Sequence, residues 1–272
     1  YPAHHTFLVI GDYVNVQQSL GTIKINNYGY PDERLGTEES VVRLPDMMKF
    51  FSDYTGQTYP YPYYSQIFVQ DFGGWKPGLA AALITENMID DKTTHEDFLY
   101  GWDLTEGEAL AAQWFGSYLV PENWTDAWLT KGFARYFSGL YNANKNGKTE
   151  FLTYQLTPDL SAYLNDWHNG SLTQVVPENN LDIAAFVNGN APYAKGARVL
   201  HLLRKELGEP QWKKVIQDFV KRNGGKTVST QDFIVSVNRM ADKNMDWFFN
   251  QWVYGVGHPI FEIKGEFNSE RK

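Results

Sequence analysis

The hydrophobic pattern of this chain changes its period part-way along the sequence. In the first part, apolar runs are typical of β-strands over residues 6–16, 21–28, 65–71 and 79–85. From Thr105 onward, apolar residues recur at helical spacing, and Thr105 and Glu108 have the spacing of a capping box that would start the first helix. Further helices are expected over residues 124–143, 149–167, 192–207, 211–220, 230–240 and 245–253. The pattern predicts a small β part followed by a larger helical part.

The composition is that of an ordinary globular protein. Its 272 residues are 43% hydrophobic and 21% charged, which fits one large domain or two small ones. The longest apolar run, residues 79–84, is too short to cross a membrane. Cysteine is absent, which excludes disulfides and thiolate metal sites but does not indicate a compartment. The net charge of −8, without a Lys/Arg cluster, predicts no nucleic-acid partner and no binding to a membrane.

Two segments near the start of the helical part stand at a fixed spacing. Residues 108–117 read E-A-L-A-A-Q-W-F-G-S, and eighteen residues separate Ala112 from Lys131, which lies within W-L-T-K-G-F-A. These segments resemble zinc aminopeptidases of the aminopeptidase N type (peptidase family M1, the gluzincin clan), where they read H-E-L-A-H-Q-W-F-G-N and W-L-N-E-G-F-A. In that family both His and the distant Glu bind one zinc ion. The Glu beside the first His is the general base on the zinc-bound water.

Further segments agree with this resemblance, in the same order along the chain. Residues 71–78 read D-F-G-G-W-K-P-G, where the family has D-F-G-G-G-M-E-N to hold the amino terminus of the substrate. Residues 193–197, Y-A-K-G-A, resemble the segment whose Tyr stabilises the tetrahedral intermediate, and residues 248–259 resemble the end of the catalytic domain. The resemblance implies an α+β, mostly α, thermolysin-like (gluzincin) catalytic-domain fold, with a small β lobe, a larger helical lobe and a cleft between them.

The two ends of the chain are expected to belong to neighbouring domains. Residues 1–20 would end a preceding β domain, residues 21–257 would form the catalytic-type domain, and residues 258–272 would begin the first strand of a following β domain. Residues 259–267 alternate between apolar and polar side chains, as a strand with one buried face does. The flanking domains of a longer chain are therefore expected partners.

The positions that carry the chemistry of the family hold other residues here. Glu108 and Ala112 replace the two His ligands, and Lys131 replaces the third ligand. Ala109 replaces the general base, and Pro77 stands at the position of the Glu that anchors the substrate amine. A catalytic zinc needs three protein ligands and an open position for water, which one carboxylate cannot supply. We expect a degenerate site that has no zinc, no other cofactor and no assigned catalytic residue.

Two features of the degenerate site allow more than one interpretation. If the fold matches, Glu108 and Lys131 point into the former zinc site and could form an ion pair; alternatively, Glu108 caps its helix and Lys131 reaches solvent. Tyr193 remains at the position of the transition-state Tyr. Without the other members of the catalytic unit, a packing role with one hydrogen bond is favoured for it.

The sequence also indicates which residues should line the predicted cleft. Its expected lining residues are Trp75, Lys76, Pro77, Gly78 and Tyr193, with Trp75 partly filling the space. The six His residues include no pair at helical spacing that could bind a metal ion. An open, aromatic cleft would favour peptide binding, whereas a cleft plugged by Trp75 and a Glu108–Lys131 pair would favour a structural role.

Three functions follow from these observations: a non-catalytic binding domain, an active hydrolase, and a purely structural domain that positions its neighbours and leaves its cleft unused. The favoured one is a catalytically inactive M1-like domain, a pseudo-peptidase that binds a peptide or protein or serves as a structural scaffold. A transcription-initiation factor subunit (TATA-binding-protein-associated factor two) has a similar domain that also lacks the zinc motif, although its role is not carried over here. The alternative is an active hydrolase, by resemblance an aminopeptidase, that uses an unrecognised site. No G-x-S-x-G segment supports that alternative, but a site made of two carboxylates stays open.

Overall fold

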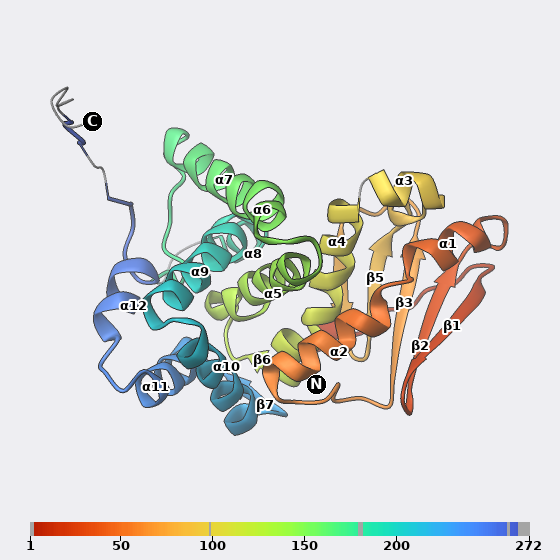
Figure 1. The fold of residues 1–272 in the computed structure, drawn as a ribbon, viewed down its shortest axis with the longest axis horizontal. Helices are drawn as coiled ribbons and strands as arrows, with labels where there is room; N and C mark the ends of the chain where they lie inside the picture. The colour runs from red at the N-terminus through yellow and green to blue at the C-terminus, as the bar shows by residue number, and fades with distance from the viewer. Residues whose placement is uncertain (1–2, 98, 179–181, 260–261, 266–272) are drawn as a thin grey trace, which may run out of the picture.

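A five-stranded sheet lies at one end of the molecule and a group of helices at the other (Figure 1). The computed structural model describes residues 3–97, 99–178, 182–259 and 262–265. The strands of the sheet are β1 (Val14–Leu20), β2 (Ile23–Gly29), β3 (Tyr63–Val69), β4 (Trp75–Gly78) and β5 (Ala81–Thr85). Their order is β1-β2-β3-β5-β4; β2, β3 and β5 run parallel, and the edge strands β1 and β4 pair antiparallel. The predicted strands at 21–28, 65–71 and 79–85 correspond to β2, β3 and β5.

Helices cover the sheet and join it to the helical lobe. Between β2 and β3 lie α1 (Arg34–Ser40) and α2 (Leu44–Thr55), neither of which the sequence pattern predicted. The helix α2 has a proline in its first turn and ends at Gly56, whose φ of 69° is accessible to glycine at no steric cost. It buries Met47, Met48 and Phe51 completely. Burial of this apolar face against the core stabilises the helix.

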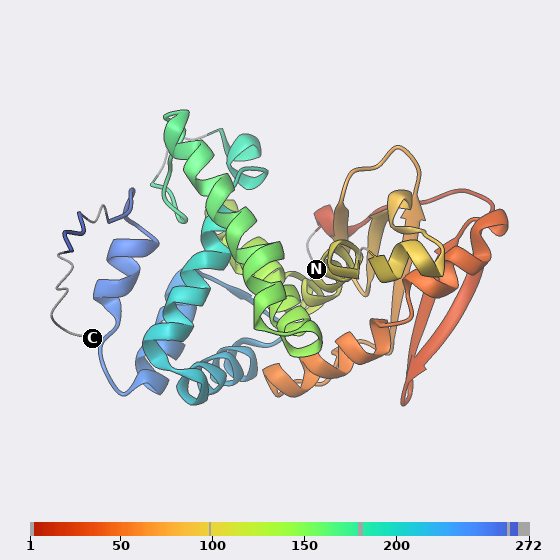
Figure 2. The ribbon, with the colours of Figure 1, turned by 45° about the horizontal axis from the view of Figure 1, so that its top comes forward.

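The rest of the chain is mostly helical, with a small second sheet. The remaining helices are α3 (Lys92–Asp97), α4 (Leu99–Ala111), α5 (Trp128–Asn146), α6 (Lys148–Phe151), α7 (Thr157–His168), α8 (Ile183–Val187), α9 (Gly196–Leu207), α10 (Glu209–Asn223), α11 (Thr230–Ala241) and α12 (Asp246–Trp252). The short strands β6 (Leu119–Pro121) and β7 (Lys226–Val228) pair parallel. Both views show the sheet on one side of α4 and α5 and the later helices on the other (Figures 1 and 2). The α+β, mostly α fold is the one that the sequence predicted.

The start of α4 differs from the prediction. The structure describes this helix from Leu99 onward, so Thr105 lies inside it, and the Thr105 hydroxyl donates to the carbonyl of Gly101 at 3.2 Å instead of capping. Asp103 and Leu104, on the turn before the predicted start, are buried, and Asp103 pairs with Arg43 of the segment before α2. Tertiary contacts therefore extend this helix beyond the local capping signal.

The ends of the chain also differ from the strand predictions. The strand predicted at residues 6–16 begins only at Val14, while Leu8 and Ile10 are exposed. Because β1 pairs with β2, residues 14–20 belong to this sheet. Residues 258, 259 and 262–265 form no strand, and the other residues of the predicted terminal strand lie outside the described residues. That β domains precede and follow residues 21–257 stays a prediction. Within the described ranges, no helix has both the length and the apolar character needed to cross a membrane.

Candidate functional site

The four positions of the degenerate motif lie on two neighbouring helices, α4 and α5. Glu108 and Ala109 lie in the last turn of α4, and the backbone N–H of Ala112 donates to the carbonyl of Glu108 at 3.0 Å. Glu108 and Ala112 therefore lie one turn apart on the same face. Ala109 and Ala112 are completely buried, and Lys131 lies in the first turn of α5.

The carboxylate of Glu108 is 3% exposed, and three side chains donate to it. Trp75 Nε1 donates to Oε2 at 2.8 Å, and Arg135 Nη1 donates to Oε1 at 2.9 Å. The Tyr193 hydroxyl lies 2.8 Å from Oε1 and 3.0 Å from Oε2. Both oxygens of this carboxylate are therefore engaged by side chains of the protein itself.

Arg135 lies between Glu108 and a second buried carboxylate, Asp159. Its Nε donates to Asp159 Oδ1 at 3.1 Å, and its guanidinium lies 5.1 Å from the centre of the Tyr193 ring. We call Trp75, Glu108, Arg135, Asp159 and Tyr193 the Glu108 cluster. It joins β4, α4, α5, α7 and the π-helical turn at Ala191–Lys195.

Burial and charge act together on the titratable groups of the Glu108 cluster. Burial lowers the pKa of Arg135, but Glu108, Tyr193 and Asp159 outweigh it and raise that pKa above its usual value. Burial raises the pKa of Asp159 to about 6, against the opposing charge of Arg135. Burial, and then the charge of Glu108, raise the pKa of Tyr193 well above its usual value. Tyr193 is therefore a neutral hydrogen-bond donor at physiological pH.

Of the two alternatives for Glu108 and Lys131, the ion pair does not form, because Glu108 pairs with Arg135 instead. The Lys131 ammonium forms no ion pair within 4.0 Å and no hydrogen bond with any residue that the structure describes. Loss of solvent lowers the pKa of Lys131, and the charge of Glu108 raises it in part. Sequence reasoning missed both Arg135 and Asp159. For Arg135 a signal existed, since it follows Lys131 by four residues and so lies on the same helix face.

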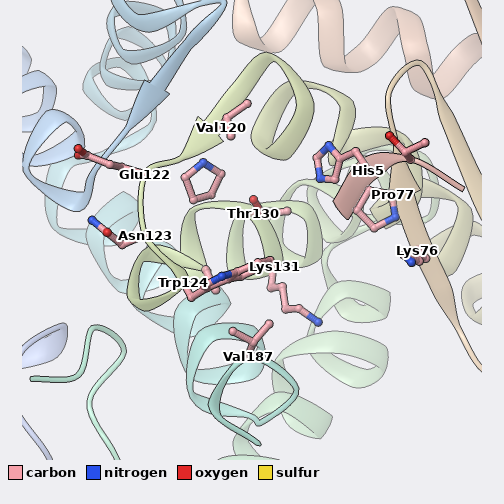
Figure 3. Close-up of a pocket in the computed structure, with 13 residues that line it drawn as sticks. His5, Lys76, Pro77, Val120, Glu122, Asn123, Trp124, Thr130, Lys131 and Val187 are labelled. Atoms are coloured by element: carbon pink, nitrogen blue, oxygen red, sulfur yellow. The ribbon is translucent and has the colours of Figure 1, made fainter. Parts of the chain in front are cut away.

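A cavity of about 580 Å³ lies beside the Glu108 cluster. Lys131 lines it from α5, and Lys76 and Pro77 line it from β4 (Figure 3). We call it the lysine cavity. The other predicted lining residues lie elsewhere: Trp75 and Tyr193 point to Glu108, as described above. Gly78 is buried, and its carbonyl accepts hydrogen bonds from Gln113 and Ser117 at 3.2 and 3.1 Å.

Hydrogen bonds between side chains and neighbouring elements hold the frame around the motif. Gln113 Nε2 also donates to the carbonyl of Ala81 at 2.9 Å, which ties the end of α4 to the sheet. Trp114 Nε1 donates to the carbonyl of Gln57 at 3.0 Å. Trp128 Nε1 donates to Thr230 Oγ1 at 2.7 Å, which ties α5 to α11. These side chains keep α4 and α5 in place whether or not the motif can bind zinc.

The sequence of the chain matches the description "Peptidase family M1 domain" over residues 40–252. The chain belongs to peptidase family M1. As an M1 domain it is degenerate, because residues 108, 112 and 131 are not the His, His and Glu of the family motif, and residue 109 is not its general base.

Individual relatives of this M1 domain include both aminopeptidases and a transcription factor subunit. It is 27% identical over 266 residues to transcription initiation factor TFIID subunit 2 of Schizosaccharomyces pombe, covering 92% of this chain and 22% of that protein. It is 26% identical over 275 residues to the alanine/arginine aminopeptidase of Saccharomyces cerevisiae, covering 97% of this chain and 32% of that one. The chain thus spans less than a third of the length of these two relatives.

A solved structure has the same fold. A crystal structure of an M1 zinc metallopeptidase from Deinococcus radiodurans, bound to a Tyr-Ser-Ala substrate, matches with a TM-score of 0.69 and 19% identity. The match covers 92% of this chain and 54% of that one. It confirms the predicted metallopeptidase fold for this chain.

The donor set of this M1 domain does not fit zinc. Ala109 and Ala112 offer methyl groups, Lys131 offers a cation, and both oxygens of Glu108 already accept hydrogen bonds. A catalytic zinc site needs three donor side chains directed at one point. Elsewhere in the described ranges, no group of three or more His, Cys, Asp or Glu residues is placed to hold a metal ion.

Proposed function

We propose that this M1 domain is a pseudo-peptidase: it has no zinc, does not hydrolyse peptides, and serves as a peptide-binding or protein-binding scaffold. One observation carries the proposal. Arg135, Tyr193 and Trp75 hold the carboxylate that stands in place of the first His ligand. A side chain used in this way is a structural link between the sheet and the helices, and each of its carboxylate oxygens already accepts a hydrogen bond from the protein.

The retained Tyr193 fits this role better than a catalytic one. In the family it would stabilise a tetrahedral intermediate, but here its hydroxyl donates to Glu108. With no general base at Ala109, the chain has no group at that position to activate water. The likeness to a protein named as a TFIID subunit, over 92% of this chain, supports a role within an assembly.

The test is zinc content, followed by peptidase activity. The purified chain is equilibrated with excess zinc, freed of unbound metal and analysed for bound zinc, with an M1 aminopeptidase treated in parallel as the positive control. We expect zinc close to zero in this chain and about one ion per chain in the control. We also expect no release of amino acids from alanyl and arginyl peptides. One tightly held zinc per chain, or hydrolysis that a chelator abolishes, would overturn the proposal.

A further inference from the structure

The lysine cavity has two cationic side chains on facing walls and no partner for either within the described residues. Lys131 comes from the first turn of α5 and Lys76 from β4. Neither ammonium group forms an ion pair or a hydrogen bond with any other residue that the structure describes. In Figure 3 the Lys131 side chain extends toward the wall that carries Lys76. Two such cations at one opening attract an anion.

The charge of the rest of the chain makes this arrangement unusual. The protein has a net charge of −8, yet this cavity contains two lysines and a single carboxylate, Glu122, among its described lining residues. Glu122 is exposed and points away from Lys131 in Figure 3. A partly buried ammonium without a partner costs free energy, which an incoming carboxylate would offset.

The rest of the cavity lining is apolar, and the volume of the cavity suits a short peptide. Ala127, Val120, Pro121 and Val187 contribute to it, together with the half-exposed indole of Trp124. A cavity of about 580 Å³ lies within the range of sites that hold small ligands, roughly 300 to 1,000 Å³. An occupant therefore needs both carboxylates and apolar side chains.

We propose that the lysine cavity binds an acidic peptide segment of a partner protein, whose carboxylates pair with Lys131 and Lys76 while its apolar side chains contact the wall at Val187 and Trp124. The polarity of recognition is thus the reverse of the one that an aminopeptidase needs, since a carboxylate of the peptide, rather than its amino terminus, is bound. This inference rests on the proposed function, because it specifies the ligand of the scaffold.

The probe is a fluorescent peptide of alternating Glu and Leu residues with its amino terminus acetylated and its carboxyl terminus amidated. Fluorescence anisotropy compares it with a matched peptide in which Gln replaces every Glu. We expect the acidic peptide to bind at least about tenfold more tightly than the neutral one, and high salt to weaken the binding. Because the probe has no free amino terminus, it reports on binding independently of zinc and of peptidase activity.

Three glutamine variants locate the binding site. We expect Lys131→Gln to weaken binding by about tenfold, since this ammonium is partly desolvated, and Lys76→Gln by about threefold, since it is exposed. Lys214→Gln, on the exposed face of α10, makes the same change in net charge and should leave binding unchanged. Circular dichroism of each variant checks that it is folded.

Several outcomes would overturn the inference. These are equal binding of the acidic and neutral peptides, an equal loss with Lys214→Gln, or no binding at all. Tighter, Lys131-dependent binding of a single-stranded oligonucleotide would assign the cavity to phosphate groups instead of carboxylates. Zinc in the purified chain, combined with Lys131-dependent binding of the blocked peptide, would refute the pseudo-peptidase proposal and leave the acidic-peptide site standing.

Discussion

Two neighbouring regions of the degenerate site differ in how their charges are satisfied. In the Glu108 cluster, the ion pairs of Arg135 are 12% exposed on the arginine side, and 3% and 2% exposed on the carboxylate sides. In the lysine cavity, Lys131 and Lys76 have no described partner and face open space. The first region links the sheet and the helices through contacts between protein side chains, and the second leaves charge available to a ligand. The comparison indicates that a degenerate zinc motif need not close the whole cleft.

The strongest test of the comparison removes the central cation of the Glu108 cluster. We expect Arg135→Met to lower the free energy of unfolding by about 3–5 kcal/mol at pH 8, because two buried carboxylates lose their partner. Urea unfolding followed by circular dichroism measures the change. Arg34→Met is the matched control: its pair with Glu38 is exposed, and its loss should stay below about 1 kcal/mol.

The loss in free energy of unfolding caused by Arg135→Met should also depend on pH. The pKa of Asp159 is already raised to about 6 in the folded chain, above its value in the unfolded chain. The folded chain therefore binds the proton first as the pH falls, and protonation relieves the buried charge. We expect the variant to recover part of its stability as the pH is lowered from about 8 to about 5, a range that spans the pKa of Asp159. A deficit no larger than that of Arg34→Met at pH 8 would show that the cluster is not a structural link.

Smaller effects are expected from the two neutral donors to Glu108. Tyr193→Phe and Trp75→Phe each remove one hydrogen bond to a buried carboxylate, which should cost about 1–2 kcal/mol each in urea unfolding. The double variant should differ from the sum of the two, because both donors share one acceptor. Tyr63→Phe, at a half-exposed tyrosine on β3, is the control and should change stability by less than about 0.5 kcal/mol. A strictly additive pair would argue against a coupled cluster.

The smallest effect should have the opposite sign. Lys131→Met keeps most of the side-chain stem but removes the desolvated ammonium, so we expect it to stabilise the chain by about 1 kcal/mol at pH 7. Burial lowers the pKa of Lys131 in the folded chain below its unfolded value. The penalty is therefore complete below the folded pKa and is lost as the pH rises from the folded to the unfolded pKa, so the advantage of the variant should fade in alkaline solution. Lys214→Met is the control, and destabilisation by Lys131→Met at pH 7 would show that the ammonium has a partner.

The sequence predicted the parts of the fold that depend on repeated local patterns. The apolar run over 65–71 predicted β3, and the helical spacing from Leu110 onward predicted the helical lobe, because both signals depend on which residues of an element are buried. The pattern did not predict α1 and α2, and it placed the start of α4 at Thr105. Those features depend on contacts such as Arg43 with Asp103, which join residues sixty positions apart.

The candidate site also has one part that the sequence predicted and one part that only the tertiary structure decided. The resemblance to the family motif predicted a degenerate zinc site, since the methyl group at 112 and the ammonium group at 131 cannot donate to a cation and one carboxylate at 108 does not make a site. The partner of Glu108 was decided by tertiary structure. Arg135 and Lys131 lie on the same helix face, and only the packing of α5 against α4 determines that the guanidinium reaches Glu108 while the ammonium faces the cavity. Charge complementarity between residues distant in the chain depends on distances of a few ångströms, which a one-dimensional pattern does not contain.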